Sequence, residues 1–96
     1  MLLQGERLEP ISRDFSVIVS KNHSFNTDTV LLASFSKPKR GETCADFGTG
    51  CGTIPIIWCV KSCPNKIYAV EIQEDACKMA QRTAEYNNLT DTIKIV

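Results

Sequence analysis

Residues 43–60 read Thr43-Cys44-Ala45-Asp46-Phe47-Gly48-Thr49-Gly50-Cys51-Gly52-Thr53-Ile54-Pro55-Ile56-Ile57-Trp58-Cys59-Val60, so three alternating glycines separate a short apolar run from a longer one. The first run has the length of a strand, and the second run, which continues toward Pro64, has the length of a helix. Pro55 is compatible with the helix, because the N–H of a residue in the first turn has no intrahelical partner. The pattern predicts a strand, a glycine-rich turn and a helix.

The residues after Pro64 repeat this alternation. Residues 66–72 have a nearly continuous apolar centre, which is typical of a parallel strand covered on both faces. Residues 73–87 predict a helix, because small and apolar side chains recur at its period: Ala76, Met79, Ala80, Thr83 and Ala84. Residues 92–96 begin a third strand. This order predicts an α/β fold, a right-handed parallel βαβαβ unit that forms half of a doubly wound sheet.

The segment before this unit predicts two smaller elements. Residues 15–19 are rich in β-forming residues and, with turn residues at 22–24, predict one arm of an N-terminal β-hairpin. A short helix follows, capped by Asn26 or Thr27. Its expected packing side carries four residues: Val30, Leu31, Ser34 and Phe35.

The composition narrows the class of protein. The chain has 96 residues, 43% hydrophobic and 23% charged, which is typical of one globular domain. Eleven basic residues balance eleven acidic ones, so charge alone predicts no nucleic-acid partner. No apolar run approaches the roughly 20 residues of a membrane helix, and we expect a cytosolic protein with no membrane partner. Five cysteines without a C-x-x-C pair, and a single histidine, predict no metal site.

A ligand site is indicated by the glycines together with Glu71. Glycines permit positive φ angles and allow a ligand to lie against the backbone. Glu71 follows Gly52 by nineteen residues, at the end of the next predicted strand, where a carboxylate can accept both hydrogen bonds from a ribose diol. Turn and acid together indicate an adenosine-containing ligand.

The charge around the turn distinguishes between such ligands. A dinucleotide fingerprint needs glycine or alanine at position 53, which is Thr53, and Asp46 would repel a pyrophosphate. No Gly-Lys-Ser or Gly-Lys-Thr follows the glycines, which excludes a phosphate-binding P-loop. A ligand with an ammonium and a sulfonium group is compatible with the carboxylate. These residues predict S-adenosylmethionine.

The stretch 46–52, together with Val70-Glu71-Ile72, resembles the cofactor site of class I S-adenosylmethionine-dependent methyltransferases. Residues 25–33 and 80–88 resemble, more narrowly, the bacterial tRNA1(Val) adenine-N6 methyltransferase family. The likeness extends from about Arg13 to the end of the sequence. It implies the N-terminal half of a Rossmann-like methyltransferase sheet, preceded by the hairpin and the short helix. The implied division is a hairpin extension over 1–26 and a partial cofactor-binding domain over 27–96.

The resemblance implies a set of cofactor-binding residues: Thr27, Asp28, Asp46, Gly48, Thr49, Gly50, Gly52, Glu71 and Ile72. The three glycines would pass under the methionine part of the cofactor, Asp46 would lie near its amino end and Glu71 would hold the ribose hydroxyls. Ile72 would press on the adenine, while Thr27 and Asp28 would approach from the N-terminal side.

The same resemblance implies methyl transfer to an adenine N6 of tRNA. The Asn-Pro-Pro-Tyr tetrapeptide that positions the target amine in amino-methylating relatives has no counterpart in these 96 residues, so we expect cofactor binding without turnover and assign no catalytic residue. Two alternatives stay open. The acceptor could be another RNA base or a protein glutamine amide, or the chain could be a non-catalytic nucleotide-binding or assembly module.

Two surface features concern further partners. In a sheet of order 3-2-1-4 the first strand lacks its far neighbour here, and an exposed strand edge predicts that the 96-residue chain dimerises or swaps strands. Lys37, Lys39 and Arg40 form a small basic cluster. We interpret it as a solvated loop, with an RNA backbone contact as the alternative.

Overall fold

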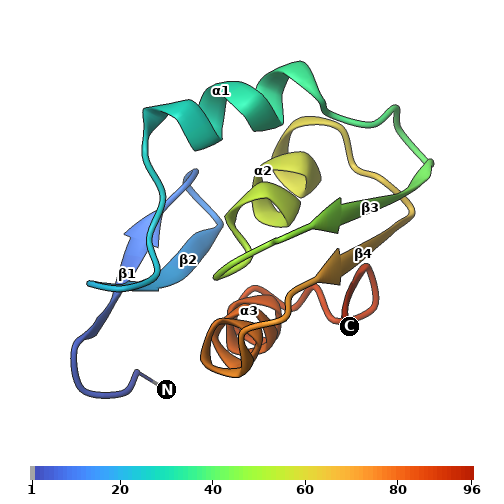
Figure 1. The fold of residues 1–96 in the computed structure, drawn as a ribbon. Coiled ribbons are helices and arrows are strands. Elements are labelled where there is room, and N and C mark those ends of the chain that lie inside the picture. Colours follow the sequence, from blue (N-terminus) through green and yellow to red (C-terminus); the bar gives the residue numbers. More distant parts are fainter. Residues whose placement is uncertain (1) are drawn as a thin grey trace.

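The computed structural model describes residues 2–96, which form a hairpin, three helices and a three-stranded sheet (Figure 1). The elements follow one another in this order: β1 (Glu6–Pro10), β2 (Ser16–Ser20), α1 (Thr27–Phe35), β3 (Thr43–Phe47), α2 (Thr53–Lys61), β4 (Lys66–Val70), α3 (Glu74–Tyr86) and β5 (Ile93–Ile95). Among these described residues, no helix is long and apolar enough to cross a lipid bilayer.

The sheet has the order β3-β4-β5, and both strand pairs are parallel. Cys44 lies opposite Ile67, and Ile67 lies opposite Ile93, so the three strands are in register. Each crossover carries one helix, α2 or α3. The predicted α/β fold with a βαβαβ unit is confirmed, and β3 forms one edge of the described sheet.

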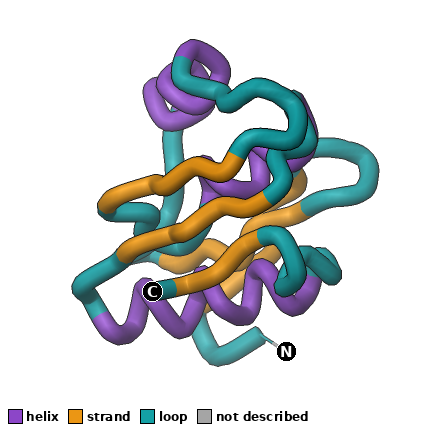
Figure 2. Tube along the Cα trace, turned by 90° about the vertical axis from the view of Figure 1, so that its right-hand side faces the viewer, coloured by secondary structure: helices purple, strands orange, loops and turns teal. Residues whose placement is uncertain are grey.

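Side chains alternate between the two faces of this sheet. Ile67, Ala69 and Ile93 are buried in the core with the helices, whereas Phe47 and Tyr68 point to the opposite face and are 82% and 44% exposed. Figure 2 shows the three strands side by side, with α3 along one side. The helix-facing side therefore forms the hydrophobic core, and the other side of the sheet is open in residues 2–96.

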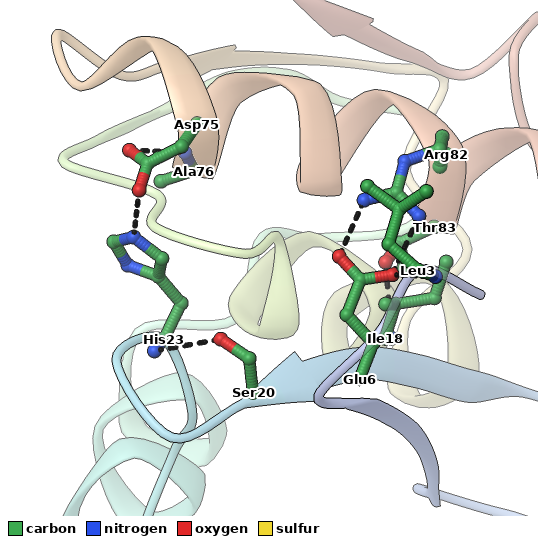
Figure 3. Close-up of polar contacts among 9 residues, drawn as sticks. All are labelled: Leu3, Glu6, Ile18, Ser20, His23, Asp75, Ala76, Arg82 and Thr83. Atoms are coloured by element: carbon green, nitrogen blue, oxygen red, sulfur yellow. Dashed lines mark hydrogen bonds and ion pairs between the residues drawn. The ribbon is translucent and has the colours of Figure 1, made fainter.

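The hairpin packs on α3 and shares the same core. Val17, Ile18 and Val19 are each at most 1% exposed. Ile18 N donates to the Thr83 hydroxyl at 3.1 Å, and the Arg82 guanidinium donates to both carboxylate oxygens of Glu6 (Figure 3). The hairpin of the prediction is thus present, and its other arm is the preceding strand β1. The boundary of the hairpin extension at residue 26 stays a prediction.

Helix α1 begins as expected but packs through a different side. Asn26 is the N-cap, and its side-chain oxygen accepts a hydrogen bond from Thr29 N at 3.1 Å. The buried residue of α1 is Ala33, whose carbonyl accepts a hydrogen bond from Trp58 Nε1 at 3.1 Å. Leu31 and Phe35, expected on the packing side, are 53% and 90% exposed. The prediction is wrong for both because α1 packs chiefly on α2, which contacts the Ala33 side.

Candidate functional site

The glycine-rich loop between β3 and α2 lies at the carboxyl end of the sheet. Gly48, Gly50 and Gly52 have φ angles of +76°, +59° and +93°, which L side chains rarely adopt. Gly48 N and Thr49 N donate to Val70 O at 2.8 and 3.0 Å, so the loop is bound to the end of β4. A Cβ atom on Gly48 or Gly50 would meet nothing within 4 Å. The backbone there is open to a ligand.

Glu71 connects this loop to the end of the neighbouring strand. Its Oε1 accepts a hydrogen bond from Gly50 N at 2.8 Å, and its Oε2 accepts one from Gln73 N at 3.0 Å. The carboxylate therefore lies beside the glycines, although the sequence separates the two by about twenty residues. Each oxygen keeps further lone pairs, because an ionised carboxylate can accept about four hydrogen bonds.

Asp46 lies at the end of β3, beneath the same loop. Burial is the largest effect and raises the pKa of its carboxyl. The nearby Thr49 side chain lowers this pKa, and the Glu71 carboxylate raises it. Asp46 Oδ2 and Thr49 Oγ1 are buried and have no hydrogen-bond partner among the described residues. Buried polar atoms without a partner are costly, so this position is suited to a polar or cationic group of a ligand.

A cavity of about 320 Å³ opens between the loop and helices α1 and α2. Four of the expected site residues line it: Asp28, Gly48, Thr49 and Gly50. No lysine, arginine or histidine is part of this lining within residues 2–96. With Asp28 in the wall and two further carboxylates nearby, the cavity favours a cationic over an anionic ligand.

The other five expected residues lie outside the lining: Asp46 and Glu71, described above, and Thr27, Gly52 and Ile72. Thr27 is exposed at the start of α1, and Ile72 is 96% exposed. Gly52 is the N-cap of α2, and a Cβ atom there would come within 3.3 Å of Ala80 Cβ on α3. The structure therefore gives Gly52 a packing role, in which the missing side chain lets two helices approach closely.

The cavity also includes residues that the sequence analysis did not name. Phe25, Thr29 and Leu32 line it from the α1 side, and Ile54 lines it from the first turn of α2. Asp28 and Leu32 are four residues apart on α1, which is the spacing of one helix face, whereas Phe25 precedes the N-cap Asn26. The spacing within α1 was present in the sequence.

His23 lies apart from this cavity, and Cys51, which lines it, belongs to no metal-ligand set among the described residues. His23 Nε2 lies 2.9 Å from Asp75 Oδ2 on α3, on the hairpin side of the molecule (Figure 3). All five cysteines are free. Within residues 2–96, no group of three or more potential metal ligands is gathered in one place.

Two comparisons by sequence give related proteins. The family model described as "Methyltransferase small domain" matches residues 16–96. The tRNA1(Val) (adenine(37)-N6)-methyltransferase of Glaesserella parasuis is 35% identical over 72 residues, which covers 72% of this chain and 31% of the relative. The chain thus spans about a third of the length of this curated relative.

Solved structures share the fold at lower identity. TrmK of M. capricolum, solved with S-adenosyl-homocysteine, has a TM-score of 0.65 and 22% identity over 77% of this chain and 32% of its own. The tRNA m1G37 methyltransferase of M. jannaschii has a TM-score of 0.74 and 15% identity over 99% of this chain and 30% of its own. These likenesses confirm the N-terminal half of a Rossmann-like methyltransferase sheet.

Proposed function

Because this chain belongs to the methyltransferase small domain family, we propose that it is the S-adenosylmethionine-binding part of an enzyme that methylates an adenine N6 of tRNA. The observation that supports this cofactor is the open glycine backbone, which has the carboxylates of Asp28, Asp46 and Glu71 around it. No cation is part of the cavity lining within residues 2–96. An ammonium and a sulfonium suit this field, and phosphates do not.

The residues present fit this cofactor on chemical grounds. The free lone pairs of Glu71 can accept the two ribose hydroxyls while its bonds to Gly50 N and Gln73 N persist. Asp46 and Thr49 offer buried polar atoms that need a partner, which a cofactor amino group would supply. Asp28 adds a carboxylate from the other wall of the cavity. In the proposed site, Thr27 and Ile72 lie at the rim, and Gly52 supports the loop from below.

The chemistry follows from this arrangement. When bound, S-adenosylmethionine supplies a methyl group activated by its sulfonium. The chain's residues hold and orient the cofactor, and positioning of this kind accounts for much of the rate of a direct displacement.

Calorimetric titration tests the cofactor. We expect S-adenosylmethionine and S-adenosyl-homocysteine to bind to the 96-residue chain, and ATP and NAD to bind at least tenfold more weakly, because each nearby carboxylate repels their phosphates. Equal binding of ATP would contradict the charge argument. If none of these ligands binds, the result would favour the alternative, a non-catalytic assembly module.

The acceptor is the finer part of the proposal. It is supported by the 35% identity to the adenine-N6 methyltransferase of G. parasuis, whereas the structural neighbours include an enzyme named for m1G37. We expect residues 1–96 alone to bind cofactor without methyl transfer. A chimera in which the remaining part of the curated relative follows Val96 is expected to transfer labelled methyl groups to tRNA. N6-methyladenosine among the digested nucleosides supports the proposal, and label in guanosine or in protein glutamine contradicts it.

The proposed setting and self-association follow from the same reasoning. A tRNA substrate implies a reaction in the cytoplasm. One edge of β3 pairs with β4, and its other edge pairs with no strand in residues 2–96. We propose that this free edge pairs with a second copy of the 96-residue chain.

A further inference from the structure

A basic pocket lies at the other end of the sheet, away from the glycine loop. It has a volume of about 430 Å³, and four cations contribute to its lining: Lys37, Lys39, Arg40 and Lys61. The first three belong to the loop between α1 and β3, and Lys61 is the last residue of α2. The basic cluster seen in the sequence is therefore joined by a fourth cation from a different segment.

No acidic residue among the described residues 2–96 lines this pocket. None of the four cations forms an ion pair within the part of the chain that the structure describes. Glu42, the acid nearest in sequence, accepts a hydrogen bond from the backbone N of Lys39 at 2.6 Å. The chain has eleven basic and eleven acidic residues, so four cations in one pocket are a local concentration in a neutral protein.

The two basic segments are held together by the backbone. Gly41 N donates to Cys63 O at 3.2 Å, and Asn65 N donates to Glu42 O at 2.8 Å. In Figure 1 the α1–β3 loop and the α2–β4 loop lie at the same end of the sheet, opposite the arrowheads of β3 and β4. The two backbone segments that carry the cations are therefore held side by side, which lowers the entropy lost when the cations bind a ligand together.

The position of the pocket indicates the size of its ligand. Strand β3 separates the pocket from the glycine loop, and its five residues span roughly 16 Å at about 3.3 Å per residue. A small anion would fill the pocket alone and have no relation to the cofactor cavity. A polyanion with phosphates at regular intervals reaches both ends of the strand.

We infer that this basic pocket binds the phosphate backbone of the RNA substrate at a distance from the base that is methylated. The inference rests on the proposed function, because it takes RNA as the substrate. Phosphate contacts of this type position an RNA without reading its sequence. An anionic membrane surface is the competing partner, and the lining offers it few apolar side chains to insert.

The test compares two double variants that change net charge equally. Lys39→Gln/Lys61→Gln removes one cation from each side of the pocket, and Lys78→Gln/Lys94→Gln removes two exposed lysines from α3 and β5. Binding of a fluorescein-labelled RNA hairpin is followed by anisotropy over a range of salt concentrations. With a counterion-release slope of about 0.7–0.9 per phosphate contact, loss of two contacts weakens binding roughly 20-fold at 0.15 M salt. The same loss lowers the steepness of the plot of log binding constant against log salt concentration by roughly 1.5, whereas the control pair retains the wild-type slope.

Further measurements make each outcome decisive. The charge-preserving pair Lys39→Arg/Lys61→Arg is expected to restore RNA binding, and thermal melts show that each variant folds. Equal weakening by both glutamine pairs overturns the inference, as does no RNA binding by the wild type. Lysine-dependent binding of phosphatidylserine vesicles in place of RNA also overturns it. S-adenosylmethionine binding, measured in parallel, is expected to be unchanged in all variants. Its absence with RNA binding retained would overturn the proposed function but not the pocket.

Discussion

Replacing Glu71 with alanine is expected to weaken S-adenosylmethionine binding by about two orders of magnitude. In the structure both carboxylate oxygens are fixed beside the glycine loop by Gly50 N and Gln73 N. Each remaining lone-pair direction can accept one ribose hydroxyl, and a hydrogen bond to a charged group contributes about 1.5–3 kcal/mol. Two such bonds at the lower value give about 3 kcal/mol, or a factor of roughly 10² in Kd.

The assay is calorimetric titration of the cofactor into the wild-type chain and three variants. Glu71→Gln keeps one acceptor oxygen, so its loss is expected to be about tenfold, corresponding to one bond of about 1.5 kcal/mol. Glu74→Ala is the matched control, because the Glu74 side chain is 85% exposed and its ion-pair partner is Lys78. An affinity of Glu71→Ala within threefold of wild type would refute the reasoning, and so would an equal loss in Glu74→Ala.

Four other changes test the loop, the buried acids and the strand edge. Gly52→Ala is expected to destabilise the fold by about 1–3 kcal/mol in urea unfolding, because it combines a positive φ with a close contact to α3. Asp46→Asn is expected to raise the Tm of the ligand-free chain, since burial raises the pKa of the carboxyl, and to weaken cofactor binding in the same preparation. The hydrogen bond from Arg82 holds the pKa of Glu6 at about 2, below its ordinary 4.5, so stability present above pH 4.5 is lost as the pH falls toward 2. Glu6→Gln should flatten that part of a pH titration of Tm, and an unchanged profile would contradict this role. Phe47→Lys at the exposed end of β3 is expected to shift light-scattering masses from dimer toward monomer, and a wild-type chain that is monomeric at high concentration would contradict the edge pairing.

The elements that the sequence predicted best are those with strong local periodicity. The five residues expected on the packing side of the helix over 73–87 are the buried residues of α3. The parallel strands were predictable from their apolar centres, and α2 was predictable despite Pro55, which lies in its first turns. In each case a single segment carries the whole signal.

Elements that depend on a distant partner were harder to predict. Strand β1 contains Glu6, Arg7, Glu9 and Pro10, so it lacks apolar alternation and exists through its pairing with β2. Helix α1 has apolar residues all round, and its contact with α2 determines which side is buried. The amino acids alone did not select between these sides.

The candidate site shows the same division. The loop glycines and Glu71 were predictable because their spacing is local to one strand-helix-strand unit. That Asp28 and the glycine loop share one cavity depends on how α1 packs, which is a tertiary property. The basic pocket likewise needed the fold, because Lys61 lies about twenty residues from the cluster that it joins.

The indole at the junction of α1 and α2 gives this protein a built-in optical reporter. Trp58 is the single tryptophan of the chain, is 5% exposed, and donates its Nε1 hydrogen to the Ala33 carbonyl. Its emission therefore monitors the seating of the helix that carries Asp28 to the cavity wall. A red shift at a denaturant concentration where the far-UV circular dichroism stays native would signal that α1 has detached while the sheet stays folded. Comparing the two signals separates local opening from global unfolding without a label.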